Sequence, residues 1–287
     1  MHDPDAIVAI PQPDKKPALG ADFRVRLISG LVMAAVVAGI LFAGPYPFYA
    51  LVAVVAVVTA WEWSRLVRGN GFDAAGGLHI ACAAGGVLLA ILGWPGLGIM
   101  LTIIGAILVF LLTVGGRSVF STAGVLYAGL PAISMIWLRS DTSFGLLAVL
   151  FLILVVVATD VGAFVSGRLL GGPKLWPAVS PNKTWSGLGG AVIASAVAAA
   201  LFALSVPGAS SLRLAAVGAV LAIVAQAGDL AESSLKRHFH VKDTSDLIPG
   251  HGGVMDRVDG LVAAAMAVGL GTFLVNVYSP ARALLLG

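Results

Sequence analysis

The chain has 287 residues, of which 59% are hydrophobic and only 11% are charged, and its mean hydropathy is +1.00. Soluble domains carry roughly 25% charged residues, so this composition excludes an ordinary soluble protein and predicts an integral membrane protein. The net charge of +3 would suit nucleic acid, but the placement of the charges argues otherwise, and we expect no nucleic-acid partner.

Residues 1–22 carry proline, aspartate and lysine without periodicity, and we interpret them as a mobile polar tail. Long apolar runs follow, separated by short polar connections. Crossing a hydrocarbon core about 30 Å thick takes about 20 helical residues, and helices satisfy their backbone groups internally. We therefore predict an all-α, polytopic membrane helix bundle with about nine transmembrane helices, near 26–43, 46–63, 76–94, 96–114, 120–138, 143–160, 184–205, 211–228 and 260–277.

The motifs divide this bundle into two parts. Residues 23–140 form the N-terminal transmembrane helices and show no motif that we can match. Residues 141–287 form the C-terminal region, which is predicted to be catalytic and contains two long polar loops, 161–183 and 229–259.

The basic residues predict the orientation of the chain. With nine helices, fourteen of the 17 lysines and arginines fall on the side of the N-terminus and both long loops. Only Arg139, Arg213 and Arg282 fall on the other side. Because basic loops face the cytoplasm, we predict a bacterial-type inner (plasma) membrane protein whose N-terminus and long loops are cytoplasmic.

The first polar segment begins at Asp160, which closes an apolar run and is either a solvated helix end or part of a site. Ser180 and Pro181 precede Lys183 and Thr184, which predicts a cap, a proline in the first turn and the start of a helix. The free N–H groups of such a helix attract phosphate. The spacing is not that of a Walker A loop, and an ordinary polar connection is the alternative.

The second segment places Asp229, Glu232 and Lys236 at positions i, i+3 and i+7, so they share one face if the helix continues past the apolar run. A solvated helical face is the ordinary interpretation of this pattern. Asp229 lies at the boundary of an apolar run, however, which favours a functional site.

The third segment, 233–259, holds most of the charges of the C-terminal hundred residues. Charge is costly in lipid, so a dense cluster of both signs in an apolar protein indicates a functional site. Asp256 and Asp259 share a helical face beside Gly252 and Gly253, and the nearby basic side chains complete a set that suits a metal ion and several phosphates. His251 either orients a ligand or is an ordinary loop histidine.

This third segment resembles the signature of the phosphatidate cytidylyltransferases, also called CDP-diacylglycerol synthases. The fixed positions of the signature are Ser233, Leu235, Lys236, Arg237, Lys242, Asp243, Ser245, Leu247, Ile248, Pro249, His251, Gly252, Gly253, Val254, Asp256, Arg257, Val258 and Asp259. The segments at Asp160, at Ser180–Thr184 and at 226–233 resemble the family in the same order, so the resemblance covers about residues 150–260. Ser186 departs from the family, which often has glutamate there, and receives no role.

The resemblance implies a reaction of CTP with phosphatidic acid, a membrane lipid, to give CDP-diacylglycerol and pyrophosphate, with Mg²⁺ as cofactor. Asp229 and Asp256 resemble the family's metal-binding aspartates, with Asp259 and Asp160 as supporting metal residues. Lys236 and Arg237 join Asp229 and Asp256 in the implied catalytic set. The implied substrate-binding residues are Ser180, Asn182, Lys183, Thr184, Lys242, Asp243, His251, Gly252, Gly253 and Arg257. A second cation and a homodimer are left open.

Other classes of protein fit the sequence less well. A transporter would place charges along a path, whereas these gather at one face, and no inverted repeat is evident. A CDP-alcohol phosphotransferase would need arginine where Ala264 stands. The main alternative is a CTP-dependent polyprenol or phytol-type lipid kinase, which would transfer the γ-phosphate instead of the cytidylyl group.

Overall fold

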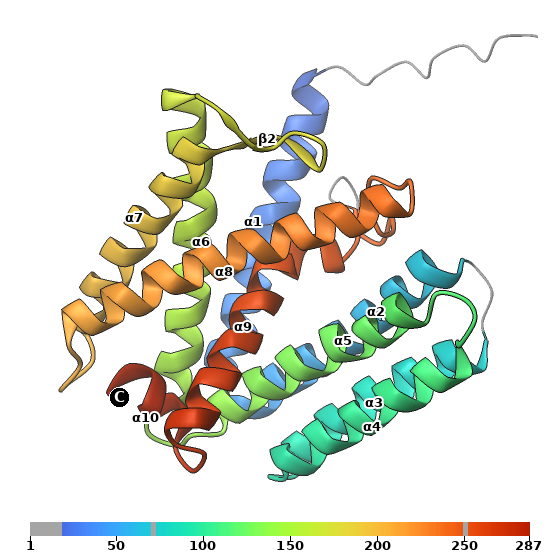
Figure 1. Cartoon of the computed structure of the whole chain (residues 1–287). Coiled ribbons are helices and arrows are strands. Elements are labelled where there is room, and N and C mark those ends of the chain that lie inside the picture. The colour runs from blue at the N-terminus through green and yellow to red at the C-terminus, as the bar shows by residue number, and fades with distance from the viewer. Residues whose placement is uncertain (1–18, 70–72, 249–251) are drawn as a thin grey trace, which may run out of the picture.

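The computed structural model describes residues 19–69, 73–248 and 252–287, with side chains from Ile28 onward. The described chain forms ten helices and one two-stranded sheet (Figure 1). In chain order these are α1 (Leu19–Ala43), α2 (Pro45–Arg68), α3 (Ala74–Ile91), α4 (Pro95–Leu112), α5 (Ser118–Arg139), α6 (Gly145–Leu170), β1 (Lys174–Trp176), β2 (Ser180–Thr184), α7 (Trp185–Ala203), α8 (Ser211–His238), α9 (Met255–Val275) and α10 (Pro280–Leu285).

The helices form two packed groups that one helix joins (Figure 1). Helices α2 to α5 pack against one another, and α6, α7 and α8 form the second group. Helix α9 contacts both α5 and α8, and the short α10 packs against its C-terminal end. The N-terminal and C-terminal halves therefore meet along α9.

Eight of the described helices, α2 to α9, are long and apolar enough to cross a membrane. They correspond to eight of the nine predicted spans, and the remaining predicted span, 26–43, lies within α1. The described apolar part of α1, Ile28–Ala43, is shorter than the other eight. The chain is an integral membrane protein built as an all-α polytopic bundle.

The side chains are distributed as in a protein surrounded by lipid. Ile133 and Ile136 of α5 pack with Phe151 and Leu152 of α6 in an apolar core where all four are almost fully buried. Large apolar side chains also cover the outside of the helices, and Leu111, for example, is 61% exposed. Soluble proteins rarely expose apolar patches larger than a few hundred Å², so these outer faces suit contact with acyl chains.

Two helices continue past the predicted ends of their apolar runs. Helix α6 runs ten residues beyond Asp160 to Leu170, and α8 runs on from Asp229 to His238. At about 1.5 Å per residue, Asp229 lies roughly 27 Å from the start of α8, which is close to the thickness of the hydrocarbon core. The polar ends of both helices therefore extend the bundle into the region of the predicted loops.

The predicted helix start at Ser180–Thr184 is wrong. These residues form strand β2, which pairs with β1 in an antiparallel hairpin between α6 and α7. Proline is tolerated on an edge strand, so Pro181 does not require a helix. Helix α7 begins at Trp185, and the cap is Thr184, whose Oγ1 accepts a hydrogen bond from Gly187 N at 3.0 Å.

The predicted tail and one predicted site residue fall largely outside the described chain. Residues 1–18 of the tail are not described, and its last four residues belong to α1. His251 also lies outside the described residues.

Candidate functional site

Lys183 is the centre of the first polar group at this end of the bundle. Strand β2 carries Lys183, and its Nζ lies 2.6 Å from Asp229 Oδ2 and 3.1 Å from Gln226 Oε1, both on α8. These three residues line an open cavity of about 550 Å³ together with Asp160, Arg168 and Asn182. Small-molecule pockets are roughly 300–1,000 Å³, so this cavity has room for a nucleotide.

Three aspartates from three helices gather beside Lys183. Asp160 on α6 and Asp259 on α9 both lie close enough to Asp229 on α8 to repel it electrostatically. The close packing of α8 and α9 depends on Gly228, where a Cβ atom would lie 2.4 Å from Ala263 Cβ and 3.1 Å from the Asp259 carbonyl oxygen. The glycine before Asp229 thus lets two of the acids approach each other.

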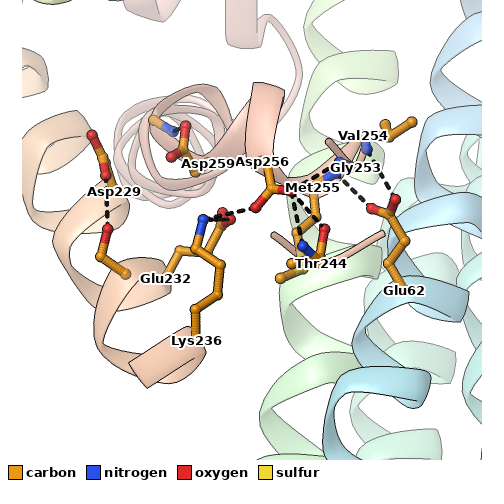
Figure 2. A network of polar contacts seen from close by, with 12 residues as sticks. Glu62, Asp229, Glu232, Lys236, Thr244, Gly253, Val254, Met255, Asp256 and Asp259 are labelled. Atoms are coloured by element: carbon orange, nitrogen blue, oxygen red, sulfur yellow. Dashed lines mark hydrogen bonds and ion pairs between the residues drawn. The ribbon is translucent and has the colours of Figure 1, made fainter. Parts of the chain in front are cut away.

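Asp256 is the centre of a second polar network, at the start of α9 (Figure 2). Its Oδ1 accepts from Lys236 Nζ at 2.7 Å. Its Oδ2 accepts from Thr244 N at 2.9 Å, from Thr244 Oγ1 at 3.0 Å and from Gly253 N at 2.9 Å. A carboxylate has about four acceptor positions, two on each oxygen, so the protein fills those of Oδ2 and leaves one open on Oδ1. These bonds give Asp256 an orienting role toward Lys236 and the loop.

Lys236 connects Asp256 to a buried glutamate (Figure 2). Its Nζ lies 3.1 Å from Glu232 Oε1, one turn earlier on α8, and Glu232 is only 2% exposed. The other oxygen, Oε2, accepts from Tyr127 Oη of α5 at 3.1 Å. The predicted shared face of Glu232 and Lys236 is confirmed, whereas Asp229 pairs with Lys183.

The two polar groups are neighbours. Asp259 interacts electrostatically with both Asp229 and Lys236, and it lies between them in Figure 2. The aspartates on α8 and α9, the lysine of β2 and the lysine of α8 therefore belong to one site.

The backbone N–H groups of Gly252 and Gly253 bond within the protein. Gly252 N donates to Ile248 O at 3.1 Å, and Gly253 N donates to Asp256. Gly252 has φ +82°, and a Cβ atom at Gly253 would lie 2.1 Å from Thr244 Oγ1, so this turn requires glycine at both positions. The two glycines shape the loop, and their predicted substrate-binding role stays a prediction.

The remaining predicted residues are divided between exposed and structural positions. The side chains of Arg237, Lys242, Asp243 and Arg257 are exposed, and no hydrogen bond or ion pair joins them to the described residues. Ser180 lies half-buried in β2, and Thr184 is buried as the cap of α7. The exposed cations remain available to bind anions near the site.

The donor chemistry of the site fits Mg²⁺ bound jointly with a substrate. Among the described residues, no three aspartate, glutamate, histidine or cysteine side chains are arranged to hold a metal ion by themselves. Mg²⁺ is usually bound by one or two carboxylates plus substrate phosphates. Asp229, with Asp259 and Asp160 nearby, supplies such carboxylates, and their mutual repulsion would be relieved by a cation.

Sequence reasoning missed two residues from the N-terminal half that contact this site. Glu62 of α2 is fully buried and accepts hydrogen bonds from Val254 N and Met255 N at 2.9 and 2.6 Å. Tyr127 of α5 reaches Glu232. The signal for Glu62 was a carboxylate inside an apolar run, but Tyr127 carried no signal that distinguishes it from an ordinary tyrosine in a membrane helix.

Comparisons with known proteins show which family the chain resembles. A model of the Cytidylyltransferase family matches residues 24–274. The phosphatidate cytidylyltransferase of Brucella suis biovar 1 (strain 1330) is 40% identical over 252 residues, covering 85% of this chain and 91% of the relative. The enzyme of the same name from Brucella melitensis biotype 1 is 38% identical over 248 residues with the same coverage. The one from Bacillus subtilis (strain 168) is 37% identical over 147 residues, covering 50% of this chain and 54% of the relative.

Proposed function

The chain belongs to the cytidylyltransferase family, and we propose that the Lys183 group and the Asp256 network together form its active site. The enzyme transfers the cytidylyl group of CTP to phosphatidate, giving CDP-diacylglycerol and pyrophosphate. The observation that carries this conclusion is the 40% identity with a phosphatidate cytidylyltransferase over 85% of the chain.

The reaction needs positioning and charge more than a strong base. A phosphate monoester has its second pKa near 6, so the attacking oxygen of phosphatidate is largely ionised near neutral pH. This oxygen attacks the α-phosphorus of CTP, and the bond from that phosphorus to the pyrophosphate oxygen breaks. Two polyanions must be brought together, so most of the catalytic benefit comes from alignment and electrostatic stabilisation.

We assign the CTP phosphates to the cavity around Lys183. Lys183 and Arg168 supply positive charge there, and Asn182 supplies an uncharged hydrogen-bonding group. The exposed side chains of Arg237, Lys242 and Arg257 lie on the adjoining elements and would attract anions to the site. Charge-assisted hydrogen bonds of this kind are stronger than those between neutral groups.

The acids and Lys236 have separate roles in this proposal. Asp229, supported by Asp259 and Asp160, would hold Mg²⁺, which when bound supplies positive charge to the phosphates of CTP. Asp256 holds Lys236 by the 2.7 Å contact and holds the loop between α8 and α9 at Thr244. Lys236 is thereby kept next to Asp259, where it can approach a substrate phosphate.

The lipid substrate would reach the site from the membrane. An apolar cavity of about 160 Å³ lies among α2, α5 and α9 and extends to Tyr127, directly beside the buried Glu232. Phe48, Val52, Met135 and Val262 are among its lining residues. A lipid phosphate at the polar network would therefore have apolar surface next to it for its hydrocarbon part.

We place the site at the cytoplasmic face of a bacterial-type inner membrane. The basic residues assigned to the opposite side support this orientation, because Arg139 ends α5, Arg213 lies in the first turn of α8 and Arg282 lies in α10. The C-terminal end of α5, the N-terminal end of α8 and the short α10 lie at the opposite end of the bundle from the start of α9, which carries Asp256 (Figure 1).

Isotope placement tests the function directly. Purified protein with phosphatidate, Mg²⁺ and CTP labelled at the α-phosphate should give labelled CDP-diacylglycerol. CTP labelled at the γ-phosphate should give labelled pyrophosphate and unlabelled lipid. A lipid that carries the γ-label would instead identify a kinase, which is the alternative that transfers the terminal phosphate.

A further inference from the structure

Glu62 is a buried carboxylate that belongs to neither polar group described above. It lies near the end of α2, is 0% exposed and makes no ion pair with the described residues. Its Oε1 accepts from Val254 N at 2.9 Å and from Ser245 Oγ, and its Oε2 accepts from Met255 N at 2.6 Å (Figure 2). A buried charge is costly unless it is fully hydrogen-bonded, and these three donors satisfy Glu62.

The donors show what Glu62 does for the neighbouring helix. The first N–H groups of a helix lack partners within the helix and carry partial positive charge. Val254 occupies the N-cap position of α9 and makes no side-chain cap hydrogen bond. Glu62 supplies the missing cap from a different helix, almost two hundred residues away in the sequence.

Glu62 and Asp256 hold consecutive backbone groups of one turn. Asp256 accepts from Gly253 N, and Glu62 accepts from the next two N–H groups, those of Val254 and Met255. The fit is tight, because a Cβ atom at Gly253 would lie 2.5 Å from Glu62 Oε1. A shift of Glu62 would therefore move the backbone that carries Asp256.

The same carboxylate also holds an earlier part of the loop. Ser245 donates to Glu62, and Thr244, the preceding residue, donates to Asp256 through both N and Oγ1. The two carboxylates thus hold the connection between α8 and α9 at two places, at 244–245 and at its end before α9. One of them comes from the N-terminal half of the chain.

We infer that Glu62 is a positioning residue for cytidylyl transfer, acting through the loop and Asp256 on Lys236 and Asp259. This inference rests on the proposed function, since it assigns the Asp256 network to the reaction. It gives the N-terminal helices a role in catalysis beyond anchoring the protein in the membrane.

The central test is Glu62→Gln, which keeps the size of the side chain. A glutamine amide would set an NH₂ group against an N–H donor, because Glu62 accepts at both oxygens. We expect kcat to fall by about 10- to 100-fold while the KM for CTP changes by less than about 3-fold. Thr122→Val is the control: Thr122 lies on α5 outside the lining of both proposed substrate cavities, and its Oγ1 has no partner among the described residues.

A second readout separates positioning from general stability. A spin label at Leu247→Cys, in a Cys82→Ala background, reports on the loop, because Leu247 is 50% exposed. Glu62→Gln should increase the label's mobility without lowering the yield of folded protein. If Glu62→Gln cannot be recovered folded, Ser245→Ala removes one of the three bonds, and kcat should then fall by about 3- to 10-fold.

The possible outcomes are distinct. Unchanged kcat in the folded variant would overturn the inference, and so would a fall in kcat with an unchanged label. Absence of CDP-diacylglycerol from both the wild-type enzyme and Thr122→Val would instead refute the proposed function. The positioning role is supported if Glu62→Gln or Ser245→Ala lowers kcat and increases the mobility of the label, while the control variant does neither.

Discussion

Lys183 and Asp256 are both charged residues of the site, but their surroundings give them different tasks. The side chain of Lys183 is 17% exposed and faces an open cavity, so it can exchange its partners for a phosphate. The side chain of Asp256 is 2% exposed and accepts from four donors of the protein itself. Loss of the Lys183 charge should therefore affect CTP binding, whereas loss of the Asp256 charge should affect the positioning of Lys236 and the loop.

Lys183→Gln should weaken the grip on CTP. The substitution keeps length and polarity but removes the charge, so kcat/KM for CTP should fall by at least about 10²-fold, corresponding to roughly 2.7 kcal/mol. Lys174→Gln is the control, since Lys174 lies exposed on the paired strand β1 and outside the cavity. Equal and small effects in steady-state assays would remove Lys183 from the site.

The two aspartates should differ in their response to metal. Asp229→Asn and Asp256→Asn should each lower turnover by at least about 10²-fold. Only Asp229→Asn should also raise the Mg²⁺ concentration needed for half-maximal activity, because donors of the protein itself already hold both oxygens of Asp256. A chelator should abolish wild-type activity, and added Mg²⁺ should restore it. An equal Mg²⁺ shift in both variants would make Asp256 a ligand as well.

The site could be predicted from sequence where its residues lie close together along the chain. The spacing of Glu232 and Lys236 predicted their shared face, and the charge density of 229–259 identified the segment. Glu62 could not be predicted to join this segment, because its partners Val254 and Met255 are nearly two hundred residues away. Only packing of α2 against the start of α9 brings them together. The use of both Asp256 oxygens likewise depends on how the loop folds back on itself.

The contact between α8 and α9 is the element on which the acidic site depends. Gly228 lies against Ala263 with no space for a side chain between them. Small residues at membrane helix interfaces let backbones approach closely. The separation of Asp229 and Asp259 is therefore set by the residue that precedes the first of them.

Gly228→Ala should separate these two helices. We expect it to destabilise the protein by about 1–3 kcal/mol, as overpacking usually does, and to reduce activity. Gly271→Ala is the matched control, because a Cβ atom there meets nothing within 4 Å. Apparent melting temperatures in detergent would measure the difference, and an unchanged value for Gly228→Ala would contradict the packing argument.

The hairpin between α6 and α7 shows why elements are harder to predict than spans. The positions of the membrane helices could be predicted because the thickness of the hydrocarbon core requires apolar runs of about 20 residues. Ser180–Thr184 carries helix-start residues, yet its backbone pairs with Lys174–Trp176 as a strand. A capping residue is present, but it is Thr184, so the helix starts four residues later than a cap at Ser180 predicted.

At the scale of the whole molecule, the charged residues of the site lie at one end of the long helix α8. Helix α8 has 28 residues and is therefore about 42 Å long, longer than the hydrocarbon core of about 30 Å. Its C-terminal end carries the site residues. The connection before Ser211 and the loop after His238 should consequently face opposite compartments.

Cysteine labelling in a Cys82→Ala background tests this arrangement. Pro207→Cys and Asp246→Cys both introduce thiols at exposed positions, before and after α8. In intact cells an impermeant thiol reagent should label Pro207→Cys and leave Asp246→Cys unlabelled until the cells are opened. Labelling of Asp246→Cys from outside would place the active site on the wrong side for the proposed orientation.

The ion pair between Lys183 and Asp229 has a consequence for how CTP and Mg²⁺ bind together. A phosphate that binds Lys183 frees Asp229 for a cation, and a cation on Asp229 frees Lys183 for a phosphate. Thermodynamic linkage then requires that each ligand raise the affinity of the other by the same factor. Calorimetric titration should find CTP and Mg²⁺ binding reciprocally coupled, and Asp229→Asn should weaken that coupling.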